Sequence, residues 1–297
     1  LLSPQPLSAA EVAGRLQGNL RAVTIVLDAL AALGFLEKQG QHYRCLPPVS
    51  DFLSPDRPES ILPMILHAAH LWRRWTHLTE AVSGEESRSA ATPPQDEEGL
   101  RAFIGAMHAI AAPMASRIVK AVNPAGARAF LDVGGASGTY TIAFLLAAPE
   151  MKATLFDQPA VVEIARKRLR EAGVLDRTTL APGDFYVDEL PGGHDLAFVS
   201  AIIHQNGPEQ NSELFKKVLR SLQPGGRIVL RDHIMEPDRT EPISGAVFAV
   251  NMLLATEGGN TYPFEELERG LTQAGFVRVR LIQKGEHMDG LVEGFKP

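Results

Sequence analysis

The sequence of 297 residues contains a single cysteine, Cys45. One thiol cannot form an internal disulfide framework, and it argues against a structural zinc site. No group of His and Cys residues has a convincing metal-ligand spacing either, so we expect a protein that works without a metal. Such low cysteine use fits a reducing compartment and predicts a cytoplasmic location.

An excess of positive charge is also missing, since 29 Lys and Arg stand against 35 Asp and Glu, a net charge of −6. Proteins that bind nucleic acid or anionic membranes usually carry a basic surface, so we expect neither partner. The least polar long segment, residues 243–256, contains Ser244 and Asn251 and is shorter than the ~18 to 20 apolar residues of a membrane span. The first residues show no secretory signal pattern.

Residues 8–50 predict a small, mainly helical module. SAAE at residues 8–11 is a capping box, which satisfies the free amides at a helix start. A second helix is expected in NLRAVTIVLDALAALGF, with Gly34 at its C-terminal cap. LEKQGQHYRCL then predicts two short strands around a turn at Gln39 and Gly40. Two helices followed by a hairpin are typical of a winged helix.

Two functions are open for this module, DNA binding and dimerisation. It holds four Lys and Arg against three Asp and Glu, and the helix that would read DNA offers only Arg21. Phosphate neutralisation requires several cations, which favours dimerisation. A winged-helix regulator that senses a small molecule is the alternative.

Residues 51–125 predict further helices, one over residues 61–82 and a long apolar one over residues 100–122. We therefore expect a helical, winged-helix-like domain over residues 1–125, which dimerises and lines the acceptor pocket. Residues 126–297 form the second expected domain.

From residue 127 onward, strands alternate with helices, which is typical of a doubly wound parallel sheet in an α/β fold. Ligands of such sheets bind at the carboxyl ends of the strands. The strands are expected at residues 127–133, 152–157, 178–185, 195–202, 227–232, 276–282 and 290–295.

A glycine turn, LDVGGASGTY, follows the first of these strands. Its spacing is D-x-G-G-x-x-G, with Asp132 before Gly134, Gly135 and Gly138. Folds that bind dinucleotides read G-x-G-x-x-G and place a pyrophosphate there, which the charge of Asp132 would oppose. The carboxylate instead favours a ligand with a cationic group. S-adenosylmethionine (SAM) has an ammonium, a sulfonium and an adenosine but no phosphate.

Acidic residues also follow the next two strands. Asp157 is placed to accept hydrogen bonds from ribose hydroxyls. Asp184 is placed to accept one from an adenine amino group, and Phe185 to stack on the base. Each carboxylate alone is better explained as a helix cap or a solvated loop residue. Together with Asp132, at successive strand ends, they favour adenosine binding.

The ordered set LDVGGASGTY, LFDQPAVVEIA, GDF, IIHQN and QPGGRIVLRD resembles the class I SAM-dependent methyltransferases. More closely, it is similar to the small-molecule O-methyltransferases that include plant caffeate and acetylserotonin enzymes and bacterial polyketide tailoring enzymes. The resemblance covers nearly the whole chain. It implies a Rossmann-like, seven-stranded sheet, an N-terminal winged-helix dimerisation domain and a homodimer. It also implies SAM as methyl donor, with S-adenosylhomocysteine (SAH) as product. The residues expected to bind the cofactor are Asp132, Gly134, Gly135, Gly138, Asp157, Gln158, Asp184, Phe185 and Ser200.

The resemblance implies that His204 is the general base, where the family reads HDW and this chain reads His-Gln-Asn. Asp232 matches the family acid that orients this histidine and stabilises the imidazolium. Gln205 replaces the usual neighbouring aspartate, and residues 258–262 lack a second family acid, so a dyad is expected. The alternative for His204 is a strand-end histidine satisfied by backbone groups. His233 would point to the opposite side if the strand continued through it.

Met107 and Met252 match family methionines near the acceptor, and Asn251 is expected beside them. Methionine favours aromatic faces, although at helical spacing it equally fits a plain core. We expect an aromatic or polyketide-like acceptor. The departures at Gln205, Asn260 and Thr261 keep open a SAM-binding relative that performs decarboxylation or hydroxylation. N- or C-methylation is also open, because such acceptors need little help from a base.

Overall fold

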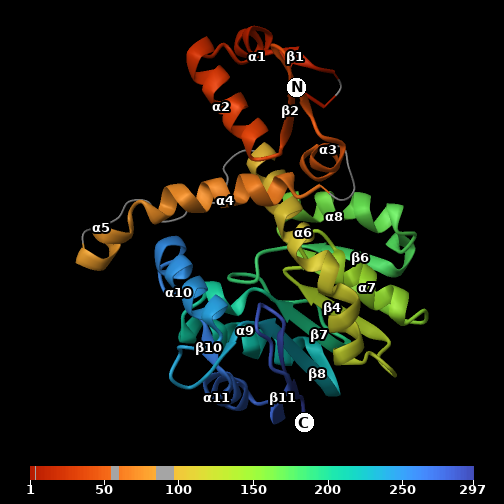
Figure 1. Ribbon diagram of the computed structural model, residues 1–297. Coiled ribbons are helices and arrows are strands. Elements are labelled where there is room, and N and C mark those ends of the chain that lie inside the picture. The colour runs from red at the N-terminus through yellow and green to blue at the C-terminus, as the bar shows by residue number, and fades with distance from the viewer. Residues whose placement is uncertain (4, 55–59, 85–96) are drawn as a thin grey trace. The chain divides into compact units, whose positions relative to one another are not determined.

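The computed structural model describes residues 1–3, 5–54, 60–84 and 97–297 (Figure 1). The chain forms two compact units, Leu1–Leu66 and His67–Pro297. This division by contacts falls within the expected N-terminal domain, and the functional boundary between residues 125 and 126 stays a prediction.

The smaller unit contains the two helices and the hairpin at the predicted residues. Its elements are β1 (Leu7–Ser8), α1 (Ala9–Leu16), α2 (Leu20–Ala32), β2 (Leu36–Gln39), β3 (His42–Cys45) and α3 (Pro47–Leu53). The strands form an antiparallel sheet in the order β1-β3-β2. The predicted capping box starts α1, since Ser8 Oγ accepts from the Glu11 N–H at 3.2 Å and Glu11 Oε2 accepts from the Ser8 N–H at 2.7 Å. Gly34 follows the end of α2 with a φ of +80°, as a C-terminal cap requires.

The larger unit contains the predicted α/β sheet of seven strands. Its strands are β4 (Ala129–Val133), β5 (Lys152–Asp157), β6 (Thr178–Pro182), β7 (His194–Ser200), β8 (Leu222–Asp232), β11 (Val277–Gln283) and β12 (Gly290–Phe295), in the order β11-β12-β8-β7-β4-β5-β6. β4 to β8 pair in parallel, and β12 is antiparallel to both of its neighbours. A separate parallel pair joins β9 (Ile234–Met235) to β10 (Tyr262–Pro263).

Helices cover both faces of this sheet (Figure 1). They are α6 (Glu97–Val122), α7 (Thr139–Ala147), α8 (Pro159–Glu171), α9 (Pro208–Ser221) and α11 (Phe264–Ala274). The unit also contains α5 (Leu78–Ser83), α10 (Ile243–Ala255) and the short 3₁₀ turns η1 (Leu175–Arg177) and η2 (Ile203–Gln205). One core cluster joins α6, α7 and α8 to the sheet, and another joins α9 and α11. Alternate strand residues enter different clusters, as the two-residue period of a strand requires. The parallel strands therefore end at one exposed edge between two helical layers.

The single helix predicted over residues 61–82 is wrong. α4 (Leu62–Trp75) ends before α5 begins at Leu78. The Thr76 hydroxyl donates to the Arg73 carbonyl at 2.7 Å, and His77 has a φ of −99° and a ψ of +14°. A side chain that bonds to the backbone competes with the helical ladder, which explains the break.

The apolar segment at residues 243–256 corresponds to α10 and is shorter than a membrane span, but a longer apolar stretch lies in α6. Residues 99–122 of α6 have the length and the mean hydropathy, 1.4, that a membrane-crossing helix needs. Several of their apolar side chains lie instead in the core of the sheet unit: Ala111, Ala115, Ile118, Val119 and Val122. Part of the apolar character of α6 therefore follows from its packing on α7.

A buried ion cluster ties the C-terminal strands to the parallel sheet. Glu293 on β12 is fully buried and accepts hydrogen bonds from Arg227 at 2.7 Å and from Arg280 at 2.6 Å. Arg227 also donates to the carbonyls of Val122 and Asn123, at the end of α6. One carboxylate thus holds β8, β11 and β12 together.

We expect Glu293→Ala to lower the free energy of unfolding by about 3 kcal/mol, because the change leaves a mostly buried guanidinium without its anion. Chemical denaturation measures this loss. Glu189→Ala is the matched control, since it removes an exposed carboxylate paired with Arg220, and it should cost less than about 1 kcal/mol. Equal losses in the two variants would contradict the role of the buried cluster.

Candidate active site

The glycine turn joins β4 to α7 with no room for side chains. Gly134 and Gly138 have φ values of +65° and +75°. A Cβ atom on Gly134 would lie 2.5 Å from Ile202 Cδ1, and one on Gly135 would lie 2.6 Å from Leu155 Cγ. The backbone of the turn therefore packs directly on β5 and on the segment after β7, and glycine allows a ligand to approach it closely.

Asp132 lies beneath this turn. It is 2% exposed, and its Oδ2 accepts a hydrogen bond from the Thr141 hydroxyl at 2.6 Å. Burial raises the pKa of Asp132 to about 7; the Thr141 bond opposes this rise and the nearby Asp157 charge adds to it. A cation placed beside this carboxyl group would lower its pKa and so favour its ionised form at neutral pH.

Asp157, the last residue of β5, holds the glycine turn. Its Oδ2 accepts from the Ala136 N–H at 2.8 Å, and its Oδ1 accepts from the Gln158 N–H at 2.7 Å. Burial raises the pKa of this carboxyl, and these two bonds lower it. Gln158 is the exposed cap residue of α8. Each carboxylate oxygen has a second lone pair, so the ribose contact predicted for Asp157 stays available.

The structure brings Phe185 to the glycine turn, as predicted. The ring lies 3.7 Å from the position of a Cβ on Gly134 and packs against the ring of Tyr186, with centroids 4.6 Å apart. Asp184 serves the local turn, since its Oδ1 accepts from the Tyr186 N–H at 2.8 Å. The contact of Asp184 with an adenine amino group stays a prediction.

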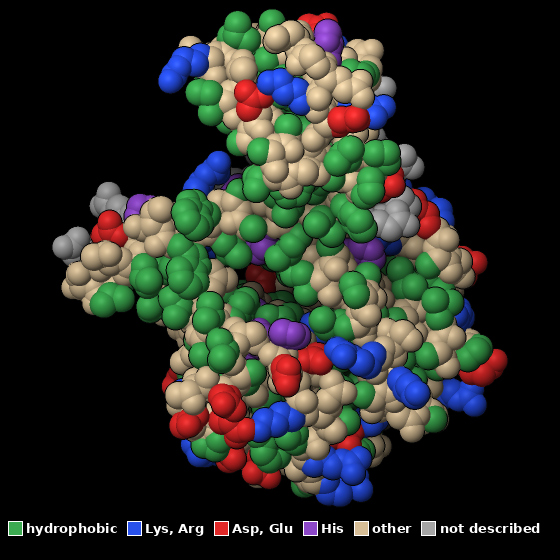
Figure 2. Space-filling model, viewed as in Figure 1, with side chains coloured by type: hydrophobic (Ala, Val, Ile, Leu, Met, Phe, Trp, Pro, Cys, Tyr) green, Lys and Arg blue, Asp and Glu red, His purple; other side chains and the backbone are tan. Residues whose placement is uncertain are grey.

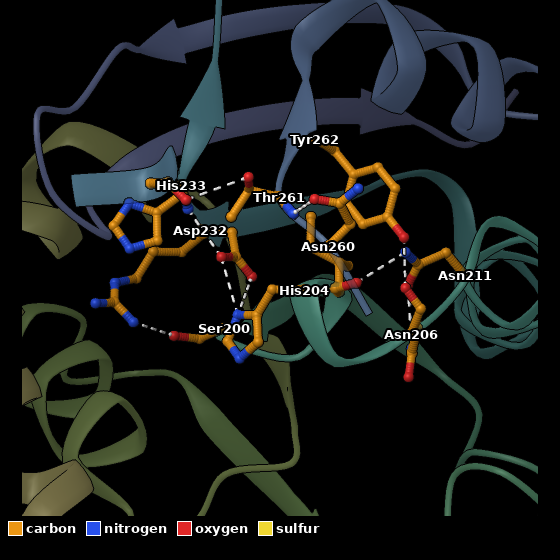
Figure 3. A network of polar contacts seen from close by, with 12 residues as sticks. Ser200, His204, Asn206, Asn211, Asp232, His233, Asn260, Thr261 and Tyr262 are labelled. Carbon is orange, nitrogen blue, oxygen red and sulfur yellow. Dashed lines mark hydrogen bonds and ion pairs between the residues drawn. The ribbon is translucent and has the colours of Figure 1, made fainter. Parts of the chain in front are cut away.

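His204 and Asp232 form the predicted pair (Figure 3). His204 lies on η2, directly after β7, and its Nδ1 is 3.0 and 2.9 Å from the two carboxylate oxygens of Asp232 at the end of β8. Their exposed fractions are 8% and 1%. Burial alone would raise the pKa of Asp232, but His204 and the backbone N–H of His233 bring it below its usual range.

This contact fixes the tautomer of the imidazole. An ionised carboxylate only accepts hydrogen bonds, so we assign the proton to Nδ1 and a lone pair to Nε2. Nε2 makes no hydrogen bond to any residue that the structure describes. The pair is therefore arranged to accept a proton from a bound molecule at Nε2.

A second polar network holds the turn that carries this histidine (Figure 3). Asn206 is fully buried; its Nδ2 donates to Asn211 at 3.0 Å, and Asn211 donates to the Ile203 carbonyl at 2.9 Å. The hydroxyl of Tyr262 donates to the Asn206 carbonyl, and that of Tyr186 donates to Asn206 Oδ1 at 2.7 Å. This network was not predicted from the sequence, because nothing local connects residue 206 with residue 262.

Residues 258–262, after α10, pack on the same turn and contain no carboxylate. A Cβ on Gly259 would lie 2.5 Å from the His204 carbonyl, and one on Gly258 would lie 3.4 Å from the Cα of Gly207. Asn260 Oδ1 accepts from the N–H of Thr261 at 2.8 Å. In the segment where the family has its second acid, this chain therefore has Asn260, whose side chain bonds to the neighbouring backbone.

Phe248 on α10 contacts both neighbouring histidines. Its ring meets His204 edge-on at 4.8 Å and lies 5.1 Å from His233. The alternation that would direct His233 to the opposite side does not apply, because β8 ends at Asp232. Burial lowers the pKa of His233 to about 4, so it is neutral at pH 7. The uniformly apolar α10 gave no sequence signal for Phe248.

The remaining predicted residues lie on α6 and α10. Met252 and Asn251 are buried on α10, which packs against η2, and Met107 is half-buried on α6. Asn251 Oδ1 finds no hydrogen-bond partner in the part of the chain that the structure describes. Figure 2 shows a hollow beside α10, with acidic and histidine side chains at it and a mainly apolar surround. Contact of these residues with an acceptor stays a prediction.

Residues 75–277 match the family model of the O-methyltransferase domain. The chain belongs to the O-methyltransferase family. It is 30% identical over 295 residues to 3-hydroxy-5-methyl-1-naphthoate 3-O-methyltransferase of Streptomyces sahachiroi, covering 97% of this chain and 85% of that protein. It is 29% identical over 309 residues to the N,N-dimethyltransferase OxyT of Streptomyces rimosus, covering 100% and 89%.

A solved structure of PigF with SAH superimposes with a TM-score of 0.86 at 25% identity, covering 98% of this chain and 90% of that one. The family resemblance, the fold class and SAM as methyl donor are thereby confirmed, and the protein is a SAM-dependent methyltransferase. The glycine turn fits this cofactor, because side chains are excluded there and carboxylates lie below and beside it.

The buried carboxyl of Asp132 predicts a pH-dependent affinity for SAH. The ligand ammonium favours the ionised form of Asp132, so binding below a pKa of about 7 must release a proton. The affinity for SAH should therefore increase as the pH is raised from about 6 to about 8. Calorimetry in two buffers of different ionisation enthalpy measures the proton release.

Asp132→Asn is the control for this titration, and it should remove the dependence over this range. A wild-type affinity that is independent of pH would show that Asp132 does not meet the ammonium group.

Proposed function

We propose that this methyltransferase transfers a methyl group to a hydroxyl of a small aromatic acceptor, with His204 as general base. The observation that carries the proposal is the buried His204–Asp232 pair with its unpaired Nε2. An exposed histidine, or one bonded through both nitrogens, would not support this role.

SAM supplies an electrophilic methyl group on its cationic sulfur when bound. The residues of the chain must then position the acceptor and remove its proton. A phenol has a pKa near ~10, so it needs a base within hydrogen-bond reach. His204 takes the proton at Nε2, while Asp232 holds the Nδ1 proton and stabilises the imidazolium. Gln205, where the family has an aspartate, carries no charge, so Asp232 alone supplies a carboxylate to the His204 imidazole in this dyad.

Aromatic and soft side chains support a flat acceptor. Phe248 places its ring beside the base, and Met252 follows one helical turn later on α10. Asn251 offers an unpaired carbonyl oxygen for a polar substituent. The relative from S. sahachiroi is named for a hydroxynaphthoate, which agrees with an aromatic or polyketide-like acceptor.

N-methylation is the second candidate, because OxyT is named as an N,N-dimethyltransferase. A neutral amine attacks through its nitrogen lone pair and loses its proton only after methyl transfer, so an N-methyltransferase would depend less on His204. The effect of removing this side chain separates the two functions.

We also propose that the enzyme is a cytoplasmic homodimer that pairs through its N-terminal domain and uses neither nucleic acid nor membrane. The helix α2 supports this, since Ile25, Val26 and Leu33 are more than half exposed. Such an apolar surface is costly in water and is typical of an interface.

We expect His204→Ala to lower turnover by ~100-fold or more while the affinity for SAH stays within about 2-fold. Labelled-methyl transfer to a panel of phenols and amines measures turnover, and calorimetry measures binding. Unchanged turnover on a phenol would exclude His204 as the base. Tight SAH binding with no methylated product in the wild type would favour decarboxylation or hydroxylation instead.

His194→Ala is the matched control. It removes another buried imidazole, bonded to Thr154 at 3.0 Å, from the opposite end of β7. The folded control should retain wild-type turnover, because this histidine lies away from the carboxyl edge of the sheet.

A further inference from the structure

Arg231 is a buried cation that pairs with no carboxylate among the described residues. Its side chain is on β8, next to Asp232, and the residue is only 3% exposed. Its Nη1 donates to the Ser200 hydroxyl at 2.9 Å, and its Nη2 contacts the sulfur of Met114 at 3.1 Å. Its Nε has no partner among the described residues. A hydroxyl and a thioether are weak partners for a guanidinium, which normally binds a carboxylate or phosphate.

The described part of the chain provides no paired counter-charge. Within residues 1–3, 5–54, 60–84 and 97–297, no carboxylate forms an ion pair with Arg231. Asp289 precedes β12, which pairs with β8, but its oxygens already accept from Arg117 at 2.8 Å and from the His287 N–H at 3.1 Å. A buried charge without a partner is strongly unfavourable, which favours an anion supplied by a bound ligand.

Tyr140 adds a second unpaired donor at the same place. It is 6% exposed, and its hydroxyl has no hydrogen-bond partner in the described part of the chain. Burial raises the pKa of Tyr140 to about 12, so the hydroxyl keeps its proton at pH 7. The Arg231 guanidinium carbon lies 5.3 Å from the centre of its ring. Two neighbouring donors therefore lack an acceptor.

The position of this pair points to a ligand of the proposed methyltransferase. Arg231 is opposite Ser200 in the register of β7 and β8, at the carboxyl edge where both strands end. Tyr140 lies in the first turn of α7, directly after the glycine turn. Strand alternation directs Arg231 to the face that α6 and α7 cover, and Asp232 to the opposite face.

We propose that Arg231 and Tyr140 bind the carboxylate group of a ligand at the carboxyl edge of β7 and β8. This inference rests on the proposed function. Two sources supply that group, the amino-acid end of the cofactor or an acid substituent on the acceptor. In either case Arg231 anchors the ligand and takes no part in proton transfer.

Calorimetry on the wild type, Arg231→Gln and the control Arg117→Gln distinguishes the sources. SAH carries the amino-acid carboxylate, and 5′-methylthioadenosine has the same adenosine without it. If the carboxylate belongs to the cofactor, Arg231→Gln should weaken the binding of SAH by about 10-fold or more and that of 5′-methylthioadenosine by less than about 2-fold. The control removes a mostly exposed guanidinium from α6 and should change neither.

If the carboxylate belongs instead to the acceptor, the affinity of Arg231→Gln for SAH stays unchanged. In protein saturated with SAH, binding of 3-hydroxy-2-naphthoate should then weaken by about 10-fold or more, and that of 2-naphthol by less than about 2-fold. Two results overturn the carboxylate site. In the first, Arg231→Gln binds all four probes like the wild type. In the second, it loses as much affinity for the carboxylate-free probe of each pair as for the carboxylate-bearing one. A wild type that binds neither adenosine ligand overturns the proposed function as well.

Tyr140→Phe gives an independent readout that does not require Arg231→Gln to fold. It removes an unpaired buried hydroxyl, so the ligand-free variant should unfold at the same temperature as the wild type or at a higher one. It should nevertheless weaken the same carboxylate-bearing probe by about 3-fold or more and spare its carboxylate-free counterpart. Unchanged binding of both acids would overturn the proposal.

Discussion

The buried contact between His204 and Asp232 is the constraint on which the rest of the site depends. The two residues are 28 positions apart, and they meet because β7 and β8 are parallel neighbours that end at the same edge. Without the imidazole, an almost fully buried carboxylate would lose its main partner. The register of the central strands, the Asn206 network and the Phe248 ring all serve to keep these two groups in place.

Adjacent residues at the end of β8 face different parts of the site. Asp232 meets the base on one face of the sheet, whereas Arg231 meets Ser200 and Met114 on the other. The two-residue period of a strand makes this separation automatic. The proposed proton removal and the proposed ligand anchoring therefore belong to neighbouring positions that do not compete for the same space, and opposite charges stay apart inside a poorly solvated region.

The sequence predicted what depends on local pattern. Alternating strands and helices, the capping box at Ser8 and the glycine turn were found because short-range rules determine them. The pairing of His204 with Asp232 was expected from the family resemblance. Contacts between distant segments were missed, such as Tyr262 with Asn206, since no local pattern encodes them.

Gly259, after α10, limits how this enzyme can evolve. A Cβ at this position would lie 2.5 Å from the His204 carbonyl, so any larger residue would displace the turn that carries His204. Substitution at this position is therefore closed by the packing of the backbone. Under the proposed function, new acceptor preferences arise through α10, where Phe248 and Asn251 can change without moving this turn.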